Sequence, residues 1–545
     1  MSESFDFIVV GSGGGSMCAA LALRARGKSV LILEKSALVG GTTATSGGVM
    51  WIPNNRFMKE AGIADSADEA NAYLDAIIGD RDDQPGANRV RRRAYVEHAA
   101  KMLDFLVAQG VRLRRIPSWP DYYDVPGASV PGRTVVSELF DIRQLGPWAS
   151  KLRPGFLPLP ANLDEAFQLA WIKRSKAAKK ILLRVLGRAI ADKLSGRKRT
   201  TAGQALQGQM LHAALKAGAE IRLDTAVNAL TVDNGRVTGV VTSKGNLGAR
   251  LGVLINAGGF ARNQQMLDRY IPGTKAEWSS VIAEDTGEMI EEAMRHGGAV
   301  AQMSERIGMQ ISLPPGSESK LVKAAMQGDV SKPHAIAVDQ KGARFTTEAC
   351  DHVEFAQAML DRKASPAWMI FDSQYLPKYM LAGTQPGANK PQAWYETKYL
   401  RRAGTIEALA ADCGIEATAL RKTVDRYNGF VRSGHDEDFH RGETPYQRWV
   451  GDPEHRPSNT LGTIEQAPFH AIQLYPGDVS TYGGLVTDEH ARVLRADGSP
   501  IPGLYATGTS TASVMGRAEV GPGGSIGPSF TFAWLAARHA LENAR

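Results

Sequence analysis

A glycine-rich run near the N-terminus is followed at a set distance by an acidic residue. The run is G-S-G-G-G-S at residues 11 to 16, and Glu34 follows Gly13 by 21 positions. Gly11 permits a tight turn, Gly13 lets the backbone approach a pyrophosphate, and the next helix offers its first N–H groups to the phosphate. Glu34 can accept hydrogen bonds from a ribose. Ser16 replaces the third glycine of the usual pattern, which affects helix packing more than phosphate contact. Together these residues can hold a dinucleotide.

The elements expected around this run are those that position such a site. Residues 5 to 10, F-D-F-I-V-V, form an apolar strand, an Ala-rich helix runs to about Arg26, and S-V-L-I-L-E at 29 to 34 is a second strand. Strand, glycine turn, helix, strand and acid in this order are typical of a Rossmann-type α/β domain. The glycine pattern alone would be weak evidence for a dinucleotide site, but the strands and helix around it make the prediction specific.

Three further segments narrow the identity of the dinucleotide. V-G-G-T-T-A-T-S-G-G at 39 to 48 follows the second strand, and both V-L-I-N-A-G-G-F at 253 to 260 and G-L-Y-A-T-G at 503 to 508 are strands that end in glycine. With Glu34, these segments resemble the FAD-binding signature of the fumarate reductase and 3-ketosteroid dehydrogenase flavoprotein superfamily. The resemblance implies an α/β, Rossmann-type FAD-binding domain interrupted by an α+β substrate domain.

The resemblance also implies how the chain is divided. The FAD-binding domain comprises residues 1–272 and 456–545, and the substrate domain comprises residues 273–455. A basic helical insertion at about 150–200 is the clear exception to the resemblance. We expect noncovalent FAD, because T-T-A-T-S at 42–46 lacks the histidine that succinate and fumarate flavoproteins with covalent flavin carry there. The residues that the resemblance assigns to FAD are Gly11, Gly13, Gly14, Gly15, Ser16, Glu34, Lys35, Gly41, Thr42, Thr43, Ser46, Gly47, Gly48, Val227, Ala257, Gly258, Gly508, Gly524, Ser525 and Ile526.

Five motifs favour the 3-ketosteroid dehydrogenases over the fumarate reductases. Soluble fumarate reductases usually place a histidine directly before T-x-G-G to hold a substrate carboxylate, whereas Val479 and Ser480 precede T-Y-G-G here. The motifs that resemble the dehydrogenases are S-G-G-V-M-W-I-P-N-N at 46–55, P-D-Y-Y at 120–123, G-D-P at 451–453, P-G-D-V-S-T-Y-G-G-L at 476–485 and V-M-G…G-P-G-G-S-I-G-P at 514–528. These dehydrogenases remove two hydrogens across a C–C bond next to a ketone.

Such a reaction needs a base that faces the α-carbon and donors that polarise the ketone oxygen. By resemblance, the backbone N–H of Gly523 is one donor, and Glu519 stands where the family has a donor tyrosine. His352 stands where the family has its catalytic base, also a tyrosine. Tyr122, with Tyr123 as the alternative, is a further active-site tyrosine.

The sequence leaves more than one role open for each of the two residues that replace tyrosines, His352 and Glu519. Neutral His352 can act as a base at pH 7 without special activation, because histidine ordinarily titrates near neutral pH; the alternative is a surface or supporting histidine. Glu519 can polarise a ketone only when protonated, which requires an apolar site that raises its pKa. Its other possible roles are an ion pair with Arg517 and acid–base catalysis of its own.

The resemblance thus implies an FAD-dependent oxidoreductase that acts on the CH–CH group next to the ketone of a 3-ketosteroid or a similar apolar cyclic ketone. The electron acceptor is unassigned. One alternative is a flavin-dependent ene-reductase that runs the same steps backwards. Another is a hydratase or isomerase of a steroid-like enone, in which FAD takes no part in redox chemistry.

Positive charge is concentrated in one segment. The chain has a net charge of +7, and Lys173 to Arg199 holds eleven basic residues and one acid, so this segment carries +10 and the remainder −3. We expect no nucleic-acid partner, because there is no wider basic surface. I-L-L-R-V-L-G-R-A-I-A-D-K-L at 181–194 has the apolar spacing of an amphipathic helix. The segment is either a solvated helix or a patch, at 172–199, that makes peripheral contact with anionic lipid.

Chain length and cysteine content limit the number of domains, the kinds of metal or disulfide site and the cellular compartment. A chain of 545 residues is expected to form two or more domains. Cys18, Cys350 and Cys413 are far apart, so we expect no metal site and no disulfide framework, which suits a reducing compartment. The sequence shows neither a signal peptide nor an uninterrupted run of about 18 apolar residues. We expect a cytoplasmic protein, which the basic segment can place at the inner face of the membrane.

Overall fold

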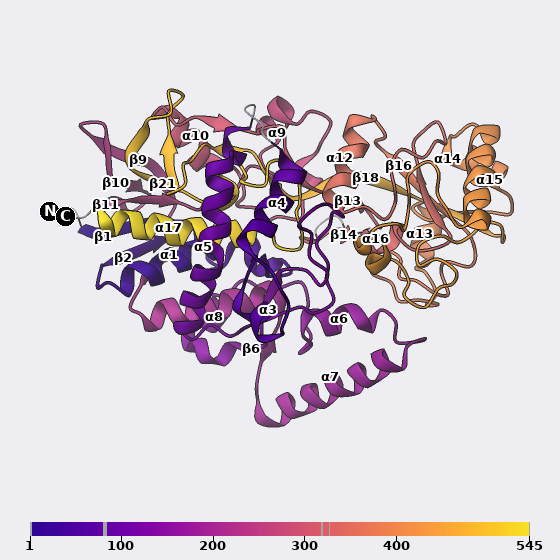
Figure 1. Cartoon of the computed structure of the whole chain (residues 1–545), viewed down its shortest axis with the longest axis horizontal. Helices are drawn as coiled ribbons and strands as arrows, with labels where there is room; N and C mark the ends of the chain where they lie inside the picture. The colour runs from indigo at the N-terminus through magenta and orange to yellow at the C-terminus, as the bar shows by residue number, and fades with distance from the viewer. Residues whose placement is uncertain (1–2, 80–83, 318–319, 326, 544–545) are drawn as a thin grey trace.

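The computed structural model describes residues 3–79, 84–317, 320–325 and 327–543, and two β-sheets dominate them (Figure 1). The larger sheet has eight strands: β1 Glu3–Val10, β2 Val30–Leu33, β8 Glu220–Arg222, β9 Val227–Asp233, β10 Arg236–Thr242, β11 Gly245–Ile255, β20 Arg492–Leu494 and β21 Pro500–Ala506. Its centre is parallel, in the order β21-β11-β1-β2-β8. β20 at one edge and the β9–β10 hairpin beside β11 are antiparallel.

The N-terminal strand, turn, helix and strand form as the sequence predicts. Alternate side chains of β1 enter two cores, since Phe7 and Val9 face one side of the sheet and Ile8 the other. Burial on both faces explains why the parallel strands are continuously apolar. Helices α1 (Gly14–Arg24) and α17 (Ile526–Glu542) pack against one another on one face of this sheet. The expected α/β fold is confirmed.

The second sheet is antiparallel and has six strands: β13 Arg306–Ser312, β14 Ala324–Ala325, β15 Ala335–Val338, β16 Ala367–Phe371, β17 Arg401–Ala403 and β18 Phe469–Thr481. Helix α12 (His352–Asp361) packs on β13 and β18, and α14 (Ile406–Cys413) packs on β17 and β18. β18 is long and reaches toward the first sheet, where Thr481 Oγ1 accepts from the N–H of Phe260 (3.4 Å). This strand therefore connects the α+β part of the chain to the Rossmann part.

The insertion at about 150–200 forms a helical hairpin, and its second helix, which carries most of the basic segment, stands away from both sheets (Figure 1). Its helices are α6 (Leu163–Leu169) and α7 (Lys176–Ser195). The inner face of α7 packs on α6 through Ile181 and Val185, and Arg188 Nη2 donates to Glu165 Oε1 (3.0 Å). None of the described helices is long and apolar enough to cross a membrane.

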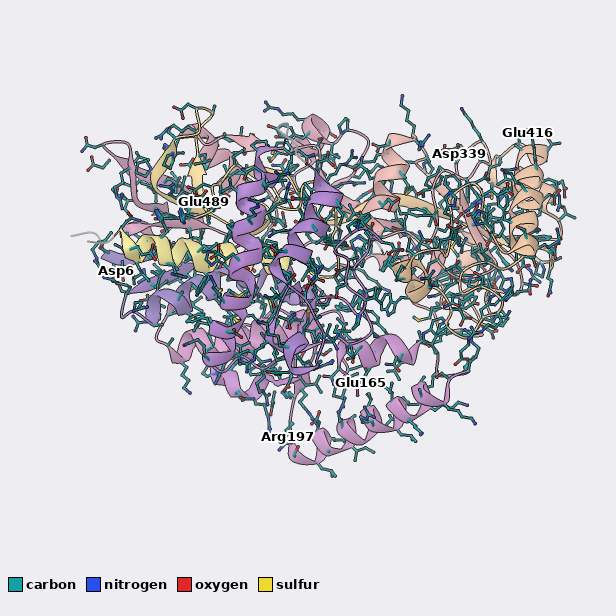
Figure 2. The ribbon with its side chains drawn as sticks, in the orientation of Figure 1. Asp6, Glu165, Arg197, Asp339, Glu416 and Glu489 are labelled. Carbon is teal, nitrogen blue, oxygen red and sulfur yellow. The ribbon has the colours of Figure 1, made fainter. Side chains whose placement is uncertain are left out.

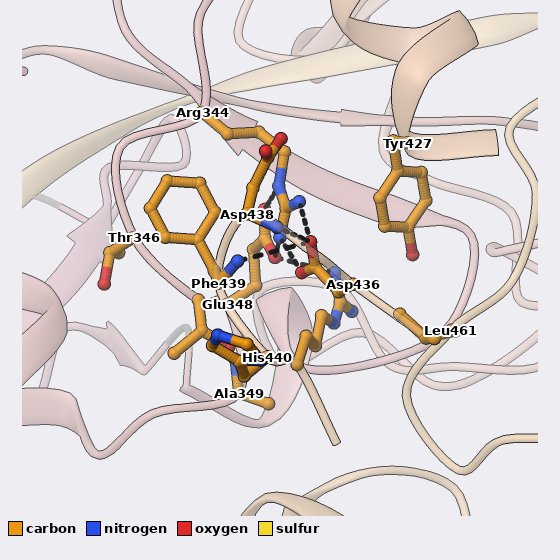
Figure 3. A network of polar contacts seen from close by, with 12 residues as sticks. Arg344, Thr346, Glu348, Ala349, Tyr427, Asp436, Asp438, Phe439, His440 and Leu461 are labelled. Carbon is orange, nitrogen blue, oxygen red and sulfur yellow. Dashed lines mark hydrogen bonds and ion pairs between the residues drawn. The ribbon is translucent and has the colours of Figure 1, made fainter. Parts of the chain in front are cut away.

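A buried ionic network holds the outer part of the second sheet together (Figure 3). Arg344 contacts both Glu348 (2.7 Å) and Asp436 (2.8 Å), and Arg441 Nη1 donates to Glu348 Oε2 (2.9 Å). Arg441 also donates to the carbonyl oxygens of Ala335 and of Lys332 (both 2.8 Å). Each charge in this network has an opposite partner, so removal of one member leaves an uncompensated buried charge.

We expect Arg441→Met to lower the free energy of unfolding by about 3–5 kcal/mol, because Glu348 then keeps only one of its two arginines. The measurement is urea unfolding of the FAD-loaded protein. Arg56→Met, which removes the exposed Arg56–Glu60 pair, is the control and should cost less than about 1 kcal/mol. An equal loss of unfolding free energy in the two variants would contradict the prediction that the buried network stabilises the fold.

Candidate active site

One cavity of about 1950 Å³ runs from the Rossmann glycine turn to the second sheet. Pockets for single drug-sized ligands measure about 300–1,000 Å³, so this cavity has room for a dinucleotide and a second ligand. The residues of the FAD prediction that line it are Gly11, Gly13, Gly14, Glu34, Lys35, Gly41, Thr42, Thr43, Ser46, Gly47, Gly48, Val227, Ala257, Gly258, Gly508, Ser525 and Ile526. His352, Tyr122, Glu519 and Gly523 line the same cavity.

The glycine turn after β1 has the shape that a pyrophosphate requires. Gly11 has a φ of 93°, and a Cβ there would lie 2.2 Å from the carbonyl oxygen of Asn256, so only glycine fits. The carboxylate of Glu34 is buried and accepts from the N–H (3.1 Å) and the hydroxyl (2.5 Å) of Ser12. It also accepts from the N–H of Ser36 (2.9 Å). The carboxylate is thus fixed beside the cavity, where a ribose would lie, and the cradle fits FAD.

Three residues of the FAD prediction lie behind the cavity wall. A Cβ on Gly15 would lie 2.7 Å from the carbonyl oxygen of Ser529, so this position serves the close packing of α1 on α17. Ser16 Oγ accepts from the side-chain amide of Asn256 (2.8 Å). Gly524 donates its N–H to Glu519 (2.9 Å). Direct contact of these three residues with FAD stays a prediction.

Sequence reasoning missed other residues that line the FAD end of the cavity. Asn256 lines the cavity and donates a hydrogen bond to Ser16. It directly follows β11, and residues at the carboxyl ends of parallel strands commonly bind ligands, so the sequence contained a signal for this residue. Asp285 is buried, and burial with the nearby negative charge of Asp478 raises its pKa to about 7. Asp285 comes from an irregular loop, so no local pattern could have marked it.

His352 begins α12 and is placed by Asp351, which caps the helix by accepting from the N–H groups of Val353 and Glu354. Nδ1 of His352 lies 2.8 Å from the carbonyl oxygen of Gly308. A carbonyl only accepts, so Nδ1 carries a proton. Nε2 is therefore the nitrogen of the neutral ring that can take a proton.

Tyr122 packs beside His352, and Tyr446 packs on Tyr122. The ring of Tyr122 lies 6.2 Å from the imidazole, edge to face, and 4.3 Å from the ring of Tyr446. Burial raises the pKa of both hydroxyl groups, so both stay neutral. Tyr446 also lines the cavity and was missed, because nothing in its local sequence distinguishes it. Tyr123 is absent from the lining residues, and its side chain is hydrogen-bonded to Asp351 instead.

Glu519 is buried and held by two donors. Its Oε2 accepts from the hydroxyl of Tyr482 (2.5 Å), and its Oε1 accepts from the N–H of Gly524 (2.9 Å). Burial raises its pKa to about 6, against the opposing effects of the charge on His352 and of the hydrogen bond from Tyr482. The side chain of Arg517 lies instead near Asp361 (3.4 Å) and Glu305 (3.6 Å). The alternative in which Arg517 pairs with Glu519 is therefore wrong.

The turn after Glu519 brings the end of the chain against β3 (Val49–Trp51). Gly523 has a φ of 99°, and a Cβ there would lie 2.5 Å from the Cα of Met50. The N–H of Trp51 donates to the carbonyl oxygen of Gly523 (3.1 Å). No backbone acceptor in the described part of the chain takes up the N–H of Gly523. This N–H and Glu519 therefore lie on one turn at the wall of the cavity.

Comparisons with known proteins agree with this geometry. Residues 6–526 match the FAD binding domain family. The chain is 37% identical to a 3-oxosteroid 1-dehydrogenase of Mycolicibacterium smegmatis, over 98% of this chain and 97% of that one. It is 33% identical to a 4-oxocyclohexanecarboxylate 2-dehydrogenase of Sinomonas cyclohexanicum, over 98% and 92%. Its structure is similar to the crystal structure of 3-ketosteroid delta1-dehydrogenase from Sterolibacterium denitrificans in complex with 1,4-androstadiene-3,17-dione. The TM-score is 0.92, the identity 35%, and the coverage 99% of this chain and 100% of that one. The chain therefore belongs to the FAD-binding flavoprotein family that contains the 3-oxosteroid 1-dehydrogenases.

Proposed function

We propose that this protein is an FAD-dependent dehydrogenase that desaturates the C–C bond next to the ketone of a 3-ketosteroid or a similar cyclic ketone. The observation that carries the proposal is the single cavity that joins the glycine cradle to His352, Tyr122, Glu519 and Gly523. When bound, FAD supplies the acceptor for the hydride that leaves the β-carbon. The residues of this chain bind the ketone, hold its oxygen and remove the α-proton.

We assign proton removal to His352. Its Nδ1–H is fixed on Gly308, so Nε2 is the atom that accepts the α-proton. Tyr122 packs beside the imidazole and restricts how it turns, and Tyr446 packs on Tyr122. They also give the α-carbon an apolar surface to rest on, as a flat apolar ketone requires.

We assign the ketone oxygen to the N–H of Gly523 and the acid form of Glu519. A carboxylic acid can accept from Tyr482 and Gly524, as the structure has it, and still donate its own proton. An apolar ketone that displaces water from the cavity raises the pKa of Glu519 further, which favours this acid form. Donors that meet a growing oxyanion contribute about 3–4 kcal/mol each.

The domain division also remains our proposal, with residues 1–272 and 456–545 around FAD and 273–455 around the ketone. In its support, the strands of the eight-stranded sheet come from Glu3–Ile255 and Arg492–Ala506. β18 falls in the second FAD-binding segment of this division but completes the six-stranded sheet, so it is the strand shared by the two parts.

We further propose that the protein is cytoplasmic and rests on the anionic inner face of the membrane through residues 172–199. Side chains of α7 point away from the body of the protein (Figure 2). Its exposed apolar residues are Leu183, Leu186, Ile190 and Leu194, on the face opposite the buried Ile181 and Val185. The spacing of three, seven and eleven residues from Leu183 places them in one stripe. With the +10 charge of the segment, this stripe suits a surface of anionic lipid.

The hairpin also connects this surface to the cavity. Phe167 and Leu169 of α6 and Ala178 of α7 line the cavity, while the outer stripe of α7 faces solvent. A ketone dissolved in the membrane would then reach the active site along the hairpin. The apolar character of the ketone makes such a route advantageous.

The catalytic reading predicts that His352→Gln lowers kcat by about 10²–10⁴-fold, because a positioned base contributes that much. The measurement is anaerobic bleaching of bound FAD by a saturated 3-ketosteroid. The flavin spectrum should be unchanged in the variant before substrate is added. Tyr395→Phe, outside the cavity lining and packed against the core of the second sheet, is the control and should bleach at nearly the parent rate. Normal bleaching by His352→Gln would move the base to Tyr122. Product formation without bleaching would instead support the hydratase or isomerase reading.

The acid role of Glu519 predicts an alkaline limb in the pH profile of kcat/KM. The raised pKa means that the acid form is populated below about pH 6 and is lost as pH rises, so kcat/KM should fall about tenfold per pH unit above it. Glu519→Gln should abolish this limb, because an amide donates without titrating. Tyr482→Phe should move the limb to higher pH, since it removes a hydrogen bond that favours the carboxylate. An unchanged limb in Glu519→Gln contradicts the assignment.

The membrane reading predicts that the double variant Leu183→Ser/Ile190→Ser binds vesicles of anionic lipid at least about tenfold more weakly, because each side chain loses its apolar burial. Co-sedimentation measures this, and added salt should weaken binding of the parent protein. Val232→Ser changes an exposed valine on β9 and is the control. Equal sedimentation of the double variant and the parent would leave α7 as a solvated helix.

A further inference from the structure

Three side chains with metal-binding atoms converge on the surface beside the second sheet. His435, His440 and Glu443 are exposed, and one ligand atom of each lies within 4.8 Å of the others. Oε1 of Glu443 lies 2.7 Å from Nδ1 of His435 and 3.4 Å from Nδ1 of His440. In the residues that the structure describes, no second group of three such side chains meets this distance limit.

In place of the absence of a metal site expected from the cysteines, we propose that these three residues bind a divalent transition-metal ion, with zinc as the best match. Two imidazoles and one carboxylate form a ligand set that suits zinc, which binds three protein groups and completes a tetrahedron with water. Zn–N and Zn–O bonds of about 2.0–2.1 Å place tetrahedral ligand atoms about 3.3 Å apart. The separation between Glu443 and His440 is close to this value, and that between Glu443 and His435 needs to widen by about 0.6 Å.

Most charges of residues 435–443 already have partners, and Glu443 is the carboxylate that faces the histidines. Asp436 is paired with Arg344, Asp438 with Arg426 and Arg441 with Glu348. Glu443 contacts both His435 and His440. All three ligand side chains are exposed, so a metal would not have to lose all of its water. The open positions of the ion would face solvent.

The backbone between the ligands is already fixed. Asp436 and Arg441 are buried members of the ionic network, and His440 lies beside that network (Figure 3). The N–H of His440 donates to the carbonyl oxygen of Asp436 (2.8 Å), and His440 has a φ of 54°, which is uncommon outside glycine. The buried contacts impose this conformation, so metal binding needs only side-chain rotation. A site that is organised before binding loses less entropy when the ion arrives.

An ion at this site would act on one wall of the cavity. The segment leads directly into α16 (Pro445–Val450), and the N–H of Gly442 donates to Oε1 of Gln447 (2.6 Å). Arg448 also donates to the carbonyl oxygen of Glu443. α16 carries Tyr446 and Trp449, which line the cavity. A metal that joins His435 to Glu443 therefore stabilises the helix that supplies this wall.

Calorimetric titration of the FAD-loaded protein with zinc chloride, without a polyhistidine tag, tests the proposal. We expect one ion per chain, with affinity at least tenfold weaker in His435→Gln and in Glu443→Gln. Zinc should also slow amide hydrogen exchange in residues 442–450 of the parent protein and not in these variants. His490→Gln is the control, because His490 is partly exposed beside Glu489 (3.7 Å) but belongs to no such group of three.

Cobalt provides a second readout, because its visible absorption reports tetrahedral ligation by protein groups. We expect cobalt absorption in the parent protein and in His490→Gln, and its loss in Glu443→Gln. The flavin spectrum of each variant confirms that it is folded. Absence of saturable zinc binding by the parent, or binding and exchange that neither substitution at 435 nor 443 alters, would overturn the proposal.

Discussion

The contact between Gly523 and the backbone of Met50 is the constraint on which the active site depends. A side chain at Gly523 would lie 2.5 Å from the Cα of Met50 and from the carbonyl oxygen of Val49. This approach is possible only without a Cβ, and it holds the turn before α17 against β3, the strand that directly follows the glycine-containing segment 39–48. The cradle for FAD and the turn that bears Glu519 are therefore parts of one packed unit. The N-terminus of α17 lies at the same place, with its positive dipole end toward the cavity.

The groups proposed as base and donor, His352 and Glu519, differ from tyrosine in their acid–base chemistry. A tyrosine hydroxyl ordinarily has a pKa near 10, whereas burial raises the pKa of Glu519 to about 6, against the effect of its hydrogen bond from Tyr482. A tyrosine hydroxyl in place of Glu519 would offer its proton throughout the neutral range, but Glu519 offers one only when protonated. The apolar ketone itself favours that state, because it displaces water from beside the carboxyl. The proposed donor role of Glu519 would thus couple binding of the substrate to protonation of this carboxyl.

The features that sequence could predict are those with local causes. The glycine turn at 11–16 and Glu34 could be identified because strand, turn and helix follow one another along the chain. The hydrogen bond between Tyr482 and Glu519 joins residues 37 positions apart, and Tyr446 reaches Tyr122 across more than 300 positions. No local pattern carries such contacts. For the same reason the sequence left an ion pair between Arg517 and Glu519 open, although in space the partners of Arg517 lie on other segments.

The outer walls of the cavity and the groups assigned to the reaction come from different parts of the molecule. The groups assigned to the reaction come from the centre of the molecule, where Gly523 packs on β3 and His352 begins α12. The outer walls come from the α6–α7 hairpin and from α16. Trp119 stacks on Trp449 of α16 at 4.9 Å and meets Phe167 of α6 edge to face at 5.2 Å, so the two walls touch through aromatic rings. A change in either wall therefore reaches the other through packing. Tyr446 of α16 packs on Tyr122, and Tyr122 packs on His352, so a change in α16 also reaches a group assigned to the reaction.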